Sequence, residues 1–264
     1  MRLNNMIKRI LLLGCIATMI ACTPTKQSTI DTTLQTKVDS ILHNKMSEIN
    51  AISGQAIVME VLTGEVKAMV GNGQKQASSL MRAVSINKAL EIGKVFLSDS
   101  VDTGNGVIVL DSDTILDHNW HRGGYGKITL KQGLVCESDI AIRKALDIVG
   151  VEAVDSLVTP LEMLKLFNGI IKNDSLKSTF RYCVTDALGK PASSEKVEVA
   201  GLSGRSIVSK ANPERIEYAV EFCGYFPADE PKYSIIVSMN KIGFPASGGL
   251  MAGSVFKEIV ESVK

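Results

Sequence analysis

Two serines near the start of an expected helix each have a basic residue three positions further along the chain. Ser79 is followed by Arg82, and Ser85 is followed by Lys88. Residues three apart share one face of a helix, so the basic group can reach the hydroxyl. A lysine amine that its surroundings keep neutral can take the serine proton and create a nucleophile. The guanidinium of an arginine stays protonated to a pKa above about 12, so the first pair lacks a base.

Histidines and cysteines do not form a metal-binding pattern. His43, His118 and His121 have no cysteine or acidic partner at the spacing of zinc ligands, so neither a metal nor a cofactor is expected. Three cysteines lie beyond residue 22, which permits one disulfide and one free thiol, or no disulfide. These are Cys136, Cys183 and Cys223.

The elements that must position these residues follow from apolar periodicity and turn residues. A helix over residues 36–50 precedes a hairpin of two early strands, and helices dominate the middle of the chain. Three late strands and a closing helix follow. This order predicts an α+β domain with a mainly antiparallel, five-stranded sheet packed with helices. The strands are expected at 55–62, 65–70, 197–208, 218–226 and 233–239, and the other helices at 79–93, 129–149, 160–172 and 253–263.

The first 22 residues predict export rather than a folded element. A positive start precedes an apolar run at 10–21 that is too short to span a bilayer comfortably, and the run ends at Cys22. This pattern is typical of a lipoprotein signal in which Cys22 is acylated. Cys15 offers a shorter alternative signal, and an uncleaved membrane anchor is the other interpretation. Polar residues 23–36 are interpreted as a tether, residues 23–50 as tether and helix, and residues 51–264 as the domain.

Charge excludes one class of partner. Residues 1–21 hold three of the 29 basic residues and none of the acidic ones, which leaves 26 basic and 28 acidic residues. No basic block or stripe is present, so a nucleic acid is not expected as a partner.

Several stretches, in order, resemble the transpeptidase domain of penicillin-binding proteins, the serine acyltransferase fold shared with β-lactamases. The resemblance covers residues 54–264 and implies that fold. It is carried by AIVMEVLTGEVKAMV (56–70), ALEIGK (89–94), VDTGNG (101–106), YGKITL (125–130), VTPLEML (158–164), FCGYFPADEPKY (222–233) and VFKEI (255–259).

That family relies on three motifs, S-x-x-K, S-x-N and K-T-G. The flanking matches place the first at Ser79, with Arg82 in place of the lysine base. The rival placement at Ser85 and Lys88 leaves too little helix before Gly93, and an ordinary helix surface explains that pair.

The other two motifs are also altered. The second falls on Glu137, Ser138 and Asp139, whereas a reading shifted to start at Ser138 ends on Ile140 and fits less well. The third falls on a strand, where the lysine is lost and a following arginine can supply positive charge. Its residues are Leu202, Ser203, Gly204 and Arg205.

The substitutions predict a new ion pair. In the family fold the first two motifs face each other, so Arg82 is expected to pair with Glu137 or Asp139. A carboxylate held against a guanidinium is a weak base for Ser79. The connections 70–79 and 150–158 are short for the family, and 172–199 looks trimmed, which removes substrate contacts as well.

These features favour a non-catalytic, penicillin-binding-protein-like lipoprotein with a binding or scaffolding role in peptidoglycan and cell-envelope biogenesis. It would sit at the periplasmic face or the outer membrane, held by its lipid, with a peptidoglycan peptide or an envelope protein as partner. One alternative is a weak serine acyltransferase or hydrolase of the D,D-transpeptidase, D,D-carboxypeptidase or β-lactamase type that uses Ser79. Another is a regulator of an active transpeptidase.

Overall fold

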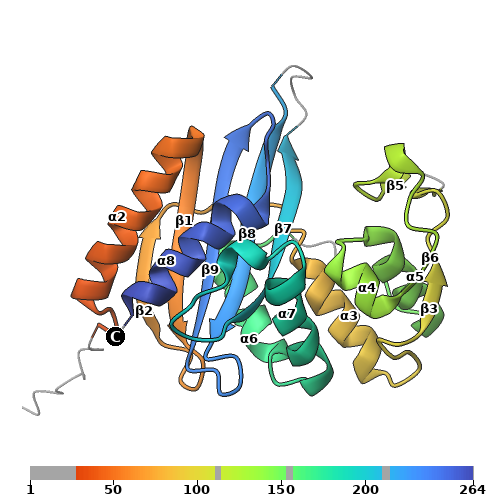
Figure 1. The fold of residues 1–264 in the computed structure, drawn as a ribbon, viewed down its shortest axis with the longest axis horizontal. Helices are drawn as coiled ribbons and strands as arrows, with labels where there is room; N and C mark the ends of the chain where they lie inside the picture. Colours follow the sequence, from red (N-terminus) through yellow and green to blue (C-terminus); the bar gives the residue numbers. More distant parts are fainter. Residues whose placement is uncertain (1–27, 111–113, 153–156, 210–214, 264) are drawn as a thin grey trace, which may run out of the picture.

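A five-stranded antiparallel sheet forms the centre of the molecule, as the sequence predicts (Figure 1). The computed structural model describes residues 28–110, 114–152, 157–209 and 215–263. The strand order is β2-β1-β9-β8-β7, so the early hairpin joins the last strand through β1, and β2 and β7 form the two edges. The strands are β1 (Ala51–Glu60), β2 (Val66–Gly71), β7 (Ala200–Ser209), β8 (Glu217–Phe226) and β9 (Tyr233–Ile242).

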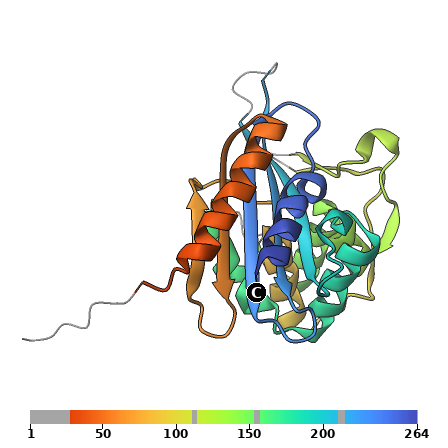
Figure 2. The ribbon, with the colours of Figure 1, turned by 60° about the vertical axis from the view of Figure 1, so that its left-hand side comes forward.

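One face of the sheet is covered by the first and last helices, α2 (Thr32–Ile49) and α8 (Ser254–Ser262), which lie side by side (Figures 1 and 2). Val38 and Leu42 of α2 join Phe256 of α8 in the core on this face. Helix α2 begins earlier than predicted, because the Asp31 side chain accepts hydrogen bonds from two backbone N–H groups in the first turn of α2. The expected tether is therefore helical from residue 32 onwards.

The opposite face carries the middle helices, which share a second core built around Leu80, Leu134, Phe167 and Phe180. The helix predicted over 129–149 is divided into α4 and α5 at Glu137, whose φ is 62°. A helix in 172–199, α7, was not predicted, because polar residues dilute its apolar stripe. These helices are α3 (Met81–Glu91), α4 (Leu130–Val135), α5 (Asp139–Val149), α6 (Pro160–Ile170) and α7 (Asp174–Asp186).

Two short, two-stranded antiparallel sheets extend the helical side of the molecule. Trp120 lies between two of these short strands in the chain and is 49% exposed. In the part of the chain that the structure describes, no helix is both long and apolar enough to cross a membrane. The short strands are β3 (Ser100–Asp102) with β6 (Lys127–Thr129), and β4 (Val107–Val109) with β5 (Thr114–Leu116).

Candidate functional site

A cleft of about 810 Å³ lies between the sheet edge at β7 and the helices α3 and α5. The motif positions Ser79, Arg82, Glu137, Asp139 and Arg205 all contribute to its lining. They come from segments far apart in sequence, so the fold assembles this site.

Ser79 lies in the turn that precedes α3, and its hydroxyl has no base. Its Oγ atom is buried and has no hydrogen-bond partner among the described residues. The hydroxyl packs on the backbone of β7, since a Cβ added to Gly204 would lie 2.4 Å from it. Gly204 is therefore required for this close approach, and the nucleophile position is enclosed between helix and strand.

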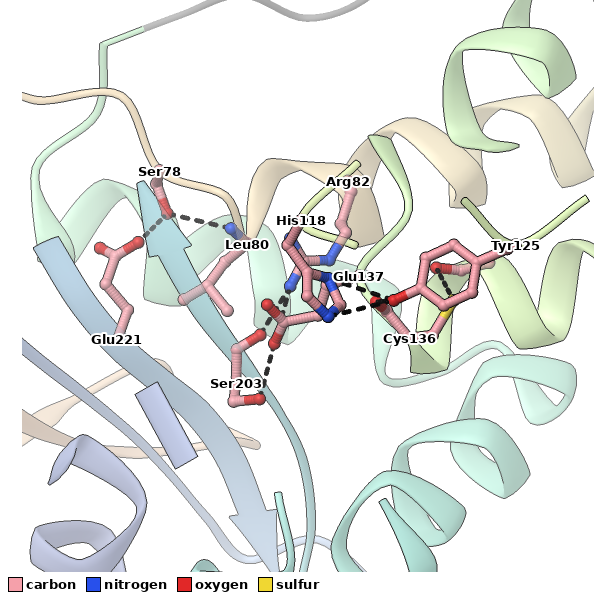
Figure 3. Close-up of polar contacts among 10 residues, drawn as sticks. Ser78, Leu80, Arg82, His118, Tyr125, Cys136, Glu137, Ser203 and Glu221 are labelled. Atoms are coloured by element: carbon pink, nitrogen blue, oxygen red, sulfur yellow. Dashed lines mark hydrogen bonds and ion pairs between the residues drawn. The ribbon is translucent and has the colours of Figure 1, made fainter. Parts of the chain in front are cut away.

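Arg82, in the first turn of α3, extends its side chain to Ser203 on β7 (Figure 3). Its Nη2 donates a hydrogen bond of 2.7 Å to the carbonyl oxygen of Ser203. The same nitrogen lies 3.3 Å from Oε1 of Glu137. The side chain of Arg82 is only 4% exposed, so its charge is balanced inside the protein by this carboxylate.

Glu137 completes the arrangement from the junction of α4 and α5. Its Oε1 accepts a hydrogen bond of 2.8 Å from the Ser203 hydroxyl, so Arg82, Glu137 and Ser203 contact one another in a closed set (Figure 3). We call these three residues the cleft clasp. A non-glycine residue with a positive φ is uncommon and carries a conformational cost. Here that backbone conformation accompanies the placement of the carboxylate in the clasp.

The neighbours of Glu137 take other roles. Ser138 is fully buried, caps α5 by accepting from the Ala141 N–H, and donates to Asp117 at 2.8 Å. Asp139 begins α5, lines the cleft and makes no ion pair with Arg82 among the described contacts. It is exposed to solvent. Crowding by protein atoms nevertheless raises the pKa of Asp139, and the charge of Arg82 opposes that effect. Of the two pairings expected for Arg82, the structure contains the one with Glu137.

The third motif position lies on β7, as expected. Leu202 faces the core, whereas the guanidinium of Arg205 lies against two aromatic rings, 6.0 Å from the centre of Tyr218 and 5.5 Å from that of Phe244. Arg205 therefore places a positive charge on the cleft wall, away from the clasp.

The two residues of the rival serine–lysine pair lie in different environments. Ser85 is buried and lines the cleft, while Lys88 is exposed on α3. The expectation that both lie on a helix surface is wrong for Ser85.

One polar group near the cleft was not singled out from the sequence. Glu221, in the middle of β8, is buried and accepts hydrogen bonds from Ser78 at 2.8 Å and Ser238 at 3.2 Å. Burial raises the pKa of Glu221 to about 7, against the opposing hydrogen bonds. A lone carboxylate in the apolar run 218–226 was the available signal. His118, whose sequence spacing does not match a metal site, lies beside Tyr125, and burial lowers the pKa of His118.

The cysteines supply no reactive group to the site. Cys136, Cys183 and Cys223 are free thiols. Burial raises the pKa of Cys136 to about 11 and that of Cys183 to about 12, and it raises the pKa of Cys223 as well. Within the described ranges, no group of histidine, cysteine or acidic side chains is placed to hold a metal ion.

Comparison with solved structures identifies the architecture. The transpeptidase domain of penicillin-binding protein 3 from Burkholderia pseudomallei superposes with a TM-score of 0.75 at 19% identity, covering 88% of this chain and 94% of that one. This chain has the transpeptidase fold. A peptidoglycan glycosyltransferase from Burkholderia ambifaria matches with a TM-score of 0.73 at 20% identity, covering 89% of this chain and 95% of that one. No family model and no curated protein matches the sequence.

On this transpeptidase fold, the clasp stands where the resemblance places the lysine base and its hydrogen-bond partners. Acyl transfer by Ser79 needs an acceptor for its proton. Arg82 cannot accept one, and Glu137 is engaged by both Arg82 and Ser203. In the described geometry the cleft can hold a ligand, and the Ser79 hydroxyl has no hydrogen-bond partner among the described residues.

Proposed function

We propose that this protein is a non-catalytic lipoprotein with a penicillin-binding-protein transpeptidase fold, which binds a ligand in the cell envelope during peptidoglycan biogenesis. One observation carries the proposal. The cleft clasp of Arg82, Glu137 and Ser203 fills the place of the base with a permanently charged, internally neutralised group.

Geometry around the nucleophile position supports the loss of chemistry. The Ser79 hydroxyl is buried against Gly204 and lacks a hydrogen-bond partner among the described residues. A serine is activated through a hydrogen bond to its base, and no such contact is present. The open cleft of about 810 Å³ beside it supports a binding role.

Labelling with a fluorescent penicillin, followed by intact-mass measurement, tests the proposal. The wild-type protein and the Ser79→Ala variant should both remain unlabelled, beside an active penicillin-binding protein as the positive control. Arg82→Lys should also remain unlabelled, because Glu137 would hold the lysine in its charged form. A stoichiometric adduct on the wild type that disappears in Ser79→Ala would show a serine acyltransferase instead.

Export and acylation require a separate experiment, because Cys15 and Cys22 lie outside the described residues. We expect incorporation of an alkyne-labelled fatty acid in a bacterial host, and its loss in Cys22→Ser. Cys15→Ser is the matched control and should keep the label. Loss in Cys15→Ser alone would move the acylation site, and absence of label in the wild type would contradict the lipoprotein assignment.

A further inference from the structure

β7 is an edge strand, and the side of it that faces away from β8 is bound by Arg82 at Ser203 but by no described residue further along, at Arg205 and Ile207. In an antiparallel strand, the N–H and C=O of alternate residues point to the same side. The Ser203 carbonyl points away from β8, toward Arg82, which binds it. The peptide groups of Arg205 and Ile207 therefore face the same outer edge. Among the described residues, β7 pairs only with β8, so these groups are available to another strand.

The side chain of Arg205 places a positive charge beside this open edge, which favours an acidic ligand. Tyr218 and Phe244 hold the guanidinium in place, and its Nη1 makes one long contact of 3.5 Å with the Ala246 carbonyl. It forms no ion pair with a described residue, whereas Arg82 and Arg143 each have a carboxylate partner. A positioned guanidinium with unused donors is suited to bind a carboxylate.

Apolar side chains border the same part of the cleft on both sides. Phe244, which is 67% exposed, and Ile207 stand on the sheet side, and Trp120 and Leu116 stand on the opposite wall. Exposed apolar groups gathered around a groove mark a binding surface rather than ordinary surface. The cleft volume of about 810 Å³ can hold several residues of an extended chain.

We infer that the open part of the cleft binds an extended acidic–apolar segment of a partner protein, which adds to β7 as a strand at Arg205 and Ile207. An aspartate or glutamate side chain of the segment binds Arg205. Apolar residues two positions away lie on the same face of the added strand and contact the Phe244 side of the cleft. The inference rests on the proposed non-catalytic role, because binding of the segment involves no covalent bond.

Peptide display tests this inference with the full chain. Random heptapeptides displayed internally, without a free carboxyl terminus, are selected on the wild-type protein. We expect enriched sequences with one acidic residue flanked by apolar residues at alternating positions. The most enriched sequence is then synthesised with acetyl and amide ends, and its affinity is measured by fluorescence polarisation.

Four variants separate the contacts. Arg205→Gln should weaken binding at least tenfold, and so should replacing the acidic residue of the peptide with its amide. Arg143→Gln removes another cleft arginine and should leave the affinity unchanged. Ile207→Pro removes an outward N–H that no other strand uses, so it should weaken binding far more than Ile207→Ala does. Thermal unfolding of each variant checks that it is folded.

Three results would overturn the inference. These are selection without an acidic consensus, equal binding by Arg205→Gln, and binding of a synthetic peptide that ends in a free D-alanyl-D-alanine carboxylate when no displayed sequence is enriched. The last result would indicate peptidoglycan as the ligand. Penicillin labelling of Ser79 would refute the non-catalytic role by itself, so the two failures are distinguishable.

Discussion

Two carboxylates near the cleft are accommodated in different ways. Glu137 faces the guanidinium of Arg82 and the Ser203 hydroxyl in the clasp. Glu221 lies in the sheet, where it accepts hydrogen bonds from the hydroxyls of Ser78 and Ser238. One carboxylate is neutralised by a paired charge, and the other has a pKa raised by burial to about 7.

The difference shows two ways in which this fold accommodates a largely buried carboxylate. In the cleft, Glu137 is paired with the positive charge of Arg82, so neither charge is left uncompensated. In the sheet, Glu221 is held by the hydroxyls of Ser78 and Ser238 and by the side chain of Gln76, and protonation offsets the remaining cost of burying its charge. The two sites should therefore respond to different perturbations, the first to loss of a partner and the second to pH.

Removal of the guanidinium should have the largest effect. Arg82→Met leaves Glu137 facing Ser203 without its cation, and removing one partner of a buried pair costs about 3 to 5 kcal/mol. Urea unfolding measures the loss. Arg143→Met, which breaks an exposed pair with Asp147, is the control and should cost less than about 1 kcal/mol. Equal losses in the two variants would mean that the ion pair of the clasp stabilises the fold no more than the exposed Arg143–Asp147 pair does.

Glu221 should produce the next largest effect, through pH. Below its unfolded-state pKa of 4.5, Glu221 is protonated in both states. As pH rises from 4.5 to about 7, the unfolded state loses this proton first, so stability falls and then levels off above the folded pKa. The full loss is about 3 kcal/mol.

Glu221→Gln should remove this pH dependence, so its stability relative to wild type should rise from pH 4 to pH 8. Unfolding curves across that range measure the difference. Glu217→Gln, on the same strand β8, is the matched control and should follow the wild type. A Glu221→Gln curve parallel to the wild type would contradict the assignment of the buried proton.

Coupling within the clasp should be smaller. Combining Arg82→Met with Glu137→Gln removes both charges, so the double variant should be about 1 to 2 kcal/mol more stable than additivity of the single losses predicts. A double-mutant cycle from urea unfolding measures this energy. Additive losses would mean that the 3.3 Å contact carries no net interaction.

The smallest effect should come from the serine that gives the family its nucleophile. Ser79→Ala removes a buried hydroxyl without a described partner, so stability should change by less than about 1 kcal/mol, neutral or favourable. Ser78→Ala removes the hydrogen bond to Glu221 and should cost more, about 1 to 3 kcal/mol. If Ser79→Ala proves the costlier change, Ser79 has a partner in solution and the site must be reconsidered.

Local pattern predicted much of the fold and part of the site. The early hairpin, the three late strands and the closing helix follow from apolar alternation and turn residues, and they appear at nearly the expected positions. Helix α7 was missed because Leu176, Phe180 and Val184 form only a narrow apolar stripe among polar residues. Trp120 is half-exposed, which the sequence does not reveal, because an aromatic residue type does not show whether another element covers it.

The sequence by itself determined that Ser79 has no lysine base three residues away, since residue type fixes the charge of a guanidinium whatever surrounds it. It also determined that Arg82 needs a carboxylate. Only the tertiary structure decided that the carboxylate is Glu137, because a break between two helices and a positive φ bring its side chain to Ser203. The environment of Glu221 was likewise decided in three dimensions, because burial and hydroxyl contacts arise from strands and loops distant in sequence.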